Sequence, residues 1–164
     1  PESKIISSEK VLMKIFTHLK CIFTFALITL FSTAQAEQFE TFGDHEIHYI
    51  VFSSELLTPE IAQQYGLERA RNLAIVNISV LDTHPLAANK PVTATMQGSF
   101  TNLAQQKKRL NFRQITEGDA VYYIASLEYT NRETLKFDIQ FQPKGSKHIS
   151  KLTFNQQLYF EPKK

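Results

Sequence analysis

The stretch that decides the fold class is Leu135-Lys-Phe-Asp-Ile-Gln-Phe-Gln142, in which apolar and polar residues alternate throughout. Successive side chains of a β-strand point to opposite faces, so this pattern predicts a strand with one packed face and one solvated face. Antiparallel sheets commonly have such a pair of faces. The stretch therefore indicates a domain built from antiparallel sheets.

Similar segments, rich in Val, Ile, Thr, Phe and Tyr, recur along the chain and are separated by turn residues. We predict strands over residues 39–42, 46–52, 73–81, 92–101, 109–116, 120–130, 135–142 and 151–160. Gly98 lies inside one of them and is typical of a β-bulge. Residues 58–66 predict a single short helix, with Thr58 as N-cap, Pro59 at the first position and Gly66 at the end. The prediction is an all-β fold, an antiparallel, immunoglobulin-like β-sandwich of about eight strands.

The first part of the chain has the organisation of an export signal. From Met13 the order is a basic stretch, an apolar run over residues 21–31 and the A-x-A sequence that ends at Ala36. The run is about eleven residues long, short of the roughly 20 that cross a bilayer, so no stable membrane anchor is expected. We predict an upstream segment at 1–12, a signal peptide at 13–36 cleaved before Glu37, and a single domain at 37–164 in the periplasm.

Removing the predicted signal changes the charge balance. Four of the 18 Lys and Arg residues and two of the 16 Asp and Glu residues precede Glu37, which leaves 14 of each sign. A neutral chain gives no reason to expect binding to nucleic acid or anionic lipid. The basic cluster Lys107-Lys108-Arg109 is interpreted as the solvated end of a strand. Cys21 lies within the signal, so the exported chain would have no thiol for a disulfide or a metal site.

The strongest candidate for metal chemistry is His45-Glu-Ile-His48. Two imidazoles three residues apart share one side of a helix, but in the predicted strand they point to opposite faces. We therefore predict no metal and no cofactor, with His45 and His48 as the alternative ligands. A hydrolase or metal-dependent enzyme would need these histidines, His84 and nearby carboxylates to converge within about 4 to 5 Å. The sequence has no Gly-x-Ser-x-Gly and no glycine-rich phosphate loop.

The candidate binding residues come from the register of one hairpin. If Gly118 and Asp119 are the central turn residues, Glu117 pairs with Ala120, and the pairing continues back to Arg109 opposite Glu128. On one face of this hairpin, near the turn, the apolar and aromatic side chains of Ile115, Tyr122 and Ile124 then surround the cation Arg113. Either the predicted helix or an adjoining loop covers this patch, or a partner or ligand binds there through Arg113, Tyr122 and Ile124.

Five segments together resemble one protein family. They are Phe42-Gly-Asp-His-Glu-Ile-His-Tyr49, residues 57–69 (LTPEIAQQYGLER), Val76-Asn-Ile-Ser-Val80, Thr101-Asn-Leu103 and Glu117-Gly-Asp-Ala-Val-Tyr-Tyr-Ile124. The chain resembles the exported proteobacterial family known as domain of unknown function 4426. The resemblance implies an envelope location and supplies no catalytic residue. We expect a non-catalytic binding or accessory protein whose partner is an envelope protein or a small ligand.

Overall fold

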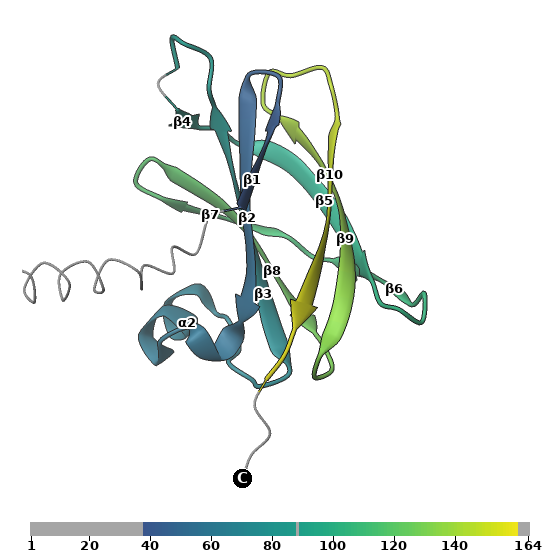
Figure 1. The fold of residues 1–164 in the computed structure, drawn as a ribbon. Coiled ribbons are helices and arrows are strands. Elements are labelled where there is room, and N and C mark those ends of the chain that lie inside the picture. Colours follow the sequence, from purple (N-terminus) through teal and green to yellow (C-terminus); the bar gives the residue numbers. More distant parts are fainter. Residues whose placement is uncertain (1–37, 88, 161–164) are drawn as a thin grey trace, which may run out of the picture. The chain divides into compact units, whose positions relative to one another are not determined.

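The computed structural model describes residues 38–87 and 89–160, and within them strands dominate (Figure 1). The strands are β1 (Gln38–Phe42), β2 (His45–Ser53), β3 (Leu73–Asp82), β4 (Lys90–Pro91), β5 (Ala94–Thr101), β6 (Lys107–Leu110), β7 (Arg113–Glu117), β8 (Ala120–Glu128), β9 (Glu133–Pro143) and β10 (Ser150–Leu158). A 3-10 turn, η2 (Ser54–Leu56), and a helix, α2 (Pro59–Tyr65), follow β2. The predicted signal peptide and its cleavage site lie outside the described residues and stay predictions.

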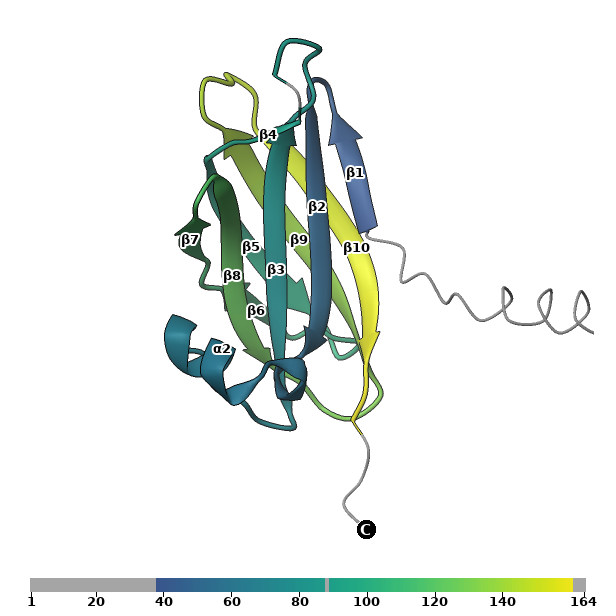
Figure 2. The same cartoon turned by 90° about the vertical axis from the view of Figure 1, so that its left-hand side faces the viewer.

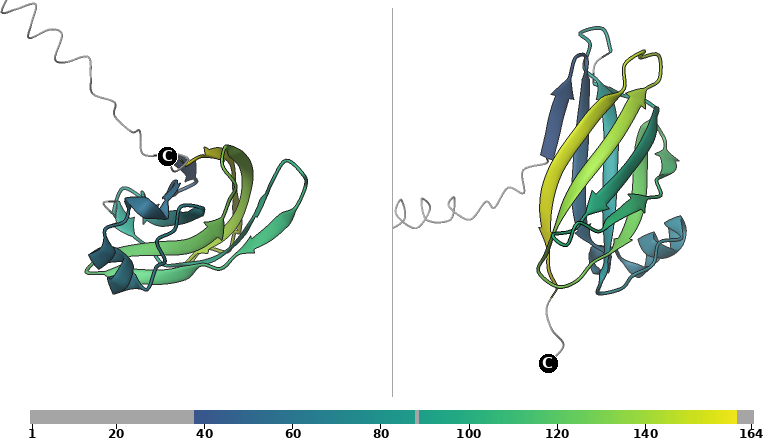
Figure 3. Two further views of the ribbon diagram at one scale, coloured as in Figure 1. Left: turned by 90° about the horizontal axis from the view of Figure 1, so that it is seen from below. Right: turned by 90° about the vertical axis from the view of Figure 1, so that its right-hand side faces the viewer.

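The strands form two antiparallel sheets that face each other (Figures 2 and 3). Sheet A has the order β1-β2-β3-β8-β7, with the short β4 also paired to β3. Sheet B has the order β10-β9-β5-β6. The predicted fold class, an antiparallel sandwich with one short α-helix, is confirmed. Among the described residues no helix is long and apolar enough to cross a bilayer.

The alternating stretch at 135–142 is the middle of β9 and supplies much of the core. Leu135, Phe137, Ile139 and Phe141 are at most 1% exposed, whereas the polar residues between them face outward. The Phe137 and Phe154 rings of sheet B stack with their centroids 4.8 Å apart, and Phe154 lies 4.4 Å from the Tyr49 ring of sheet A. Each fully buried side chain of this size stabilises the fold by about 1.5–3 kcal/mol.

The prediction of one strand over 109–116 is wrong, because the chain changes sheets there. β6 pairs with β5 in sheet B, whereas β7 pairs with β8 in sheet A. Alternation identifies a strand, but it does not show that the strand is interrupted at Asn111 and Phe112. The two-residue strand β4 was also not predicted, since one cross-strand step leaves no periodic signal.

Gly98 allows this crossing instead of forming a bulge. The β5–β9 register runs unbroken from Ala94 opposite Pro143 to Thr101 opposite Lys136. A Cβ on Gly98 would lie 3.0 Å from Ile139 Cγ1 and 3.2 Å from Phe112 Cε2. A side chain at this position would be tight against its neighbours, and because the register is unbroken the bulge interpretation is wrong.

The hairpin register is confirmed next to the turn and is wrong beyond it. Five pairs, from Glu117 with Ala120 to Arg113 with Ile124, match the prediction. Gly118 has a φ of +55°, as the first residue of a type II′ turn needs. Arg109 lies opposite Ser99 on β5 instead of Glu128.

The helix forms where the capping residues predict it. Thr58 Oγ1 accepts a hydrogen bond from the Ile61 backbone nitrogen at 3.3 Å, Pro59 is the first helical residue, and Gly66 ends the helix with a φ of +57°. α2 lies beside the outer face of sheet A, at the end of the sheet where β2 leaves it (Figure 2).

Candidate functional site

A cavity of about 190 Å³ lies between α2 and the outer face of sheet A. Its lining comes from β2, β3, β7, β8 and the segment around the helix. The lining residues are Phe52, Leu57, Ile61, Tyr65, Leu67, Ile75, Asn77, Ile115, Glu117, Tyr122 and Ile124. We call it the helix-covered cavity.

The floor of the cavity is set by strand register. Three cross-strand pairs project from the outer face of sheet A: Phe52 with Ile75, Asn77 with Ile124 and Ile115 with Tyr122. Side chains paired in this way lie about 5 Å apart and support one another. The floor is therefore rigid and almost entirely apolar, and α2 forms the opposite wall.

Asn77 is the exception in this apolar floor. Its Oδ1 atom is buried and has no hydrogen-bond partner among the described residues. A buried acceptor without a partner costs about 1–3 kcal/mol of desolvation energy. A molecule that enters the cavity with an N–H or O–H group would recover this energy, so Asn77 gives the cavity a preference for ligands that carry a donor.

Side-chain hydrogen bonds hold the helix and the segment that carries it. Arg113 Nη2 on β7 donates to the Tyr65 carbonyl at 2.9 Å, at the end of α2 where the helix dipole is negative. Ser54 is fully buried, donates to the Ala70 carbonyl and accepts from the Ala70 nitrogen, both at 2.9 Å. The Arg113 bond thus ties the C-terminal end of α2 to sheet A, whereas the Ser54 bonds close the base of the segment that carries the helix.

The structure brings the three predicted binding residues to this region in different roles. Tyr122 and Ile124 line the cavity and are half-buried. Arg113 holds α2 and is not a lining residue. The helix thus covers the patch, as one interpretation had it, but leaves a cavity between itself and the sheet. Asn77 was not predicted as a site residue, although it is the first polar residue to face outward in the apolar run of β3, followed by Ser79.

The histidines occupy separate places. His48 Nε2 lies 3.3 Å from Glu46 Oε2, and its ring stacks on Phe39 at 5.4 Å between centroids. His45 is three residues away on the same strand and so points to the other face. His84 Nδ1 accepts from the Leu86 nitrogen in a loop. Within the described part of the chain, no three His, Cys, Asp or Glu side chains are arranged to hold a metal.

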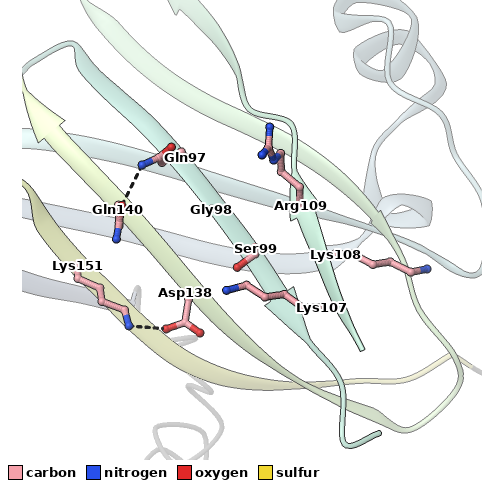
Figure 4. A pocket seen from close by; sticks show the side chains of 9 residues that line it. All are labelled: Gln97, Gly98, Ser99, Lys107, Lys108, Arg109, Asp138, Gln140 and Lys151. Carbon is pink, nitrogen blue, oxygen red and sulfur yellow. Dashed lines mark hydrogen bonds and ion pairs between the residues drawn. The ribbon is translucent and has the colours of Figure 1, made fainter. Parts of the chain in front are cut away.

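A second, polar groove of about 500 Å³ lies on the outer face of sheet B (Figure 4). Gln97 Nε2 donates to Gln140 Oε1 at 2.9 Å. Asp138 accepts from Lys151 at 2.9 Å and from Thr153 at 3.1 Å, and these bonds lower the pKa of its carboxyl group. The basic cluster at 107–109 is the edge strand β6, and Figure 4 shows Lys108 pointing away from Asp138.

These features define an antiparallel β-sandwich protein with a helix-covered cavity on the outside of one sheet. The family model of the domain of unknown function DUF4426 matches residues 39–161. The chain therefore belongs to this family. No curated protein matched it.

Solved structures agree with this assignment. A DUF4426 family protein from Pseudomonas aeruginosa PAO1 is 32% identical, with a TM-score of 0.68 over 79% of this chain and 99% of that one. FetP from uropathogenic Escherichia coli strain F11 is 13% identical, with a TM-score of 0.54 over 77% of this chain and 96% of its own. A copper-bound FetP variant is 12% identical, with a TM-score of 0.55 and coverages of 78% and 93%. At these identities the likeness to FetP shows the fold alone.

Proposed function

We propose that the chain is an exported, non-catalytic binding protein of the bacterial periplasm and that it binds a small ligand in the helix-covered cavity. The observation that carries the proposal is the buried Oδ1 of Asn77, which has no hydrogen-bond partner in the part of the chain that the structure describes, in an otherwise mainly apolar cavity. Packing a helix against the outer face of a sheet needs no such acceptor, and an apolar residue there would stabilise the fold.

The size and lining of the cavity define the class of ligand. An apolar cavity of about 150 Å³ is known to hold benzene, so about 190 Å³ holds one ring or a short branched chain. Most of the lining is apolar and its one charged residue is the carboxylate Glu117, so the cavity favours a ligand body without negative charge. Asn77 favours a hydrogen-bond donor on that body. Small phenols and alcohols of similar size meet both conditions.

Phenol and toluene make a matched pair of probes, because they share a shape and differ in the donor. We expect phenol to shift the NMR signals of residues around Asn77 in a saturable way. It should bind about fivefold more tightly than toluene, since a hydrogen bond contributes a net free energy of about 1 kcal/mol.

Two variants test the location. Ile124→Phe places a ring inside the cavity and should abolish binding of both probes. Ile50→Phe is the control, because Ile50 lies on the same outer face, is 46% exposed and does not line the cavity. Saturable binding that survives Ile124→Phe would refute the site.

Export is supported by the basic stretch, the apolar run and the A-x-A sequence before Glu37. The mass of the intact protein from a cell-envelope fraction is its test. We expect a chain that begins within a residue or two of Glu37, and recovery of residues 13–36 on the protein would contradict it.

The alternative is a metal-dependent enzyme or hydrolase that uses His45, His48, His84 and nearby carboxylates. The copper bound by the FetP variant is the only point in its favour, and an identity of 12% does not transfer a site. The separate positions of the three histidines make it the weaker proposal.

A further inference from the structure

The charges of this formally neutral domain are segregated between the two sheets. Segments 94–110 and 133–158, which contain sheet B, carry seven Lys and Arg residues and two Asp and Glu residues. Segments 38–91 and 113–128, which contain sheet A and α2, carry four Lys and Arg residues and ten Asp and Glu residues. The formal excess is therefore five positive charges on one side and six negative charges on the other.

Strand register places much of the positive charge on the outer face of sheet B (Figure 4). The side chains of this face lie in rows that run across the strands. The rows are Lys107, Thr101, Lys136 and Asn155, then Arg109, Ser99, Asp138 and Thr153, then Gln97, Gln140 and Lys151. They contain four cations and one carboxylate, and every side chain in them is polar. We call these rows the cationic face.

The single carboxylate does not neutralise the cationic face. Asp138 is already paired with Lys151 and bonded to Thr153. Lys107, Arg109 and Lys136 remain as surplus cations, with hydroxyl and amide groups between them. A face without aliphatic or aromatic side chains cannot hold an acyl chain or a ring, but it complements a hydrated surface of phosphate groups.

We propose that the cationic face docks reversibly on the surface of an anionic phospholipid bilayer. Its three surplus cations span the sheet from β6 to β9, two strand spacings of about 4.8 Å each, and Lys144 and Lys147 extend the charge into the loop after β9. This area is wider than one small anion can contact. The acidic side of the molecule is repelled by the same bilayer, so the protein docks in one orientation, with the helix-covered cavity facing the solvent.

Solubility alone does not account for this distribution. A charged outer face keeps a sheet soluble, and lysines on an edge strand such as β6 oppose edge-to-edge pairing. Both purposes are served by interspersed charges of either sign. Segregation by sheet adds a strong field on one side of the protein, which is what attraction to a charged surface requires.

Vesicle co-sedimentation tests the proposal. The chain from Glu37 onward is used, so that the apolar run at 21–31 cannot contribute to binding. We expect binding to phosphatidylcholine vesicles that contain about 30% phosphatidylglycerol at low salt, little binding to pure phosphatidylcholine, and loss of binding at several hundred millimolar salt.

Two double variants with equal net charge locate the surface. Lys107→Gln with Arg109→Gln removes two cations from the cationic face, and we expect affinity to fall about 25-fold, at about fivefold for each cation. Arg69→Gln with Lys90→Gln removes two exposed cations from the acidic side, and affinity should change less than about twofold.

Three results would overturn the proposal. The first is equal weakening by the two double variants, which would make net charge the cause. The second is the absence of salt-sensitive binding to anionic vesicles, which would exclude a bilayer and favour an acidic protein as the partner of the cationic face. The third is displacement from vesicles by millimolar inorganic phosphate at matched ionic strength, which would show a site for a small anion.

Discussion

Asn77→Leu tests the central feature of the site through stability. Asn77 Oδ1 is buried without a partner among the described residues, and the adjoining cavity of about 190 Å³ has room for the larger leucine side chain. The substitution removes an unsatisfied acceptor and buries more apolar surface without overpacking. We expect the free energy of unfolding to rise by about 1–2 kcal/mol, which for a domain of this size raises the thermal midpoint by about 4–8 °C.

Calorimetry and urea unfolding measure this change, and one matched variant controls for strand propensity. Asn155→Leu makes the same substitution at an exposed outer-face position of β10, where we expect a change within about 0.5 kcal/mol. Asn77→Leu should also remove the preference for phenol over toluene. A loss of stability of about 1 kcal/mol or more at Asn77 would refute the reasoning, because it would show that the acceptor is satisfied in the native protein.

Four further outcomes are expected. Gly98→Ala should lower the free energy of unfolding by about 1–3 kcal/mol in urea titrations, because the added Cβ meets Ile139, Phe112 and the Asp138 backbone; an unchanged midpoint would contradict the packing at this position. Arg113→Gln removes the hydrogen bond to the Tyr65 carbonyl and should cost about 0.5–1.5 kcal/mol while weakening phenol binding, whereas binding at full affinity would show that α2 does not need it. The pKa of the Asp138 carboxyl group is lowered in the folded protein, so its ionised form stabilises the fold above the ordinary pKa of 3.8, and this stability is lost as the pH falls through the lowered pKa. In Asp138→Asn the urea midpoint should therefore depend less on pH on the acid side. Chelator and reducing agent should leave the thermal midpoint of the chain from Glu37 unchanged, and a fall of several degrees with EDTA would support a structural metal.

The sequence predicted the fold where local pattern and tertiary structure agree. Alternation in β9 is visible because its apolar residues face the core between the sheets and its polar residues face the solvent. The hairpin at Gly118 was predictable because its turn and its side-chain pattern select the same register. The capping residues of α2 located the helix for the same reason.

The failures have a common physical cause, since they depend on contacts between distant segments. Nothing local marks Asn111 and Phe112 as the point where the chain leaves sheet B for sheet A. Gly98 was interpreted as a bulge because the ring that packs closely against it, that of Phe112, is 14 residues away in the sequence. The neutral net charge hid the segregation, since only the strand order shows which charges share a face.

The placement of β5 has a consequence for the folding rate. β5 pairs with β9 across a long sequence separation, as in the Gln97–Gln140 hydrogen bond 43 residues apart, and β6, β7 and β8 lie between them in the chain. Closing that loop costs conformational entropy before the contacts between β5 and β9 can offset it, whereas the β7–β8 hairpin closes over a two-residue turn. We therefore expect the hairpin to form early and the β5–β9 pairing to limit refolding to milliseconds or slower, a rate that stopped-flow fluorescence of the tyrosines can measure.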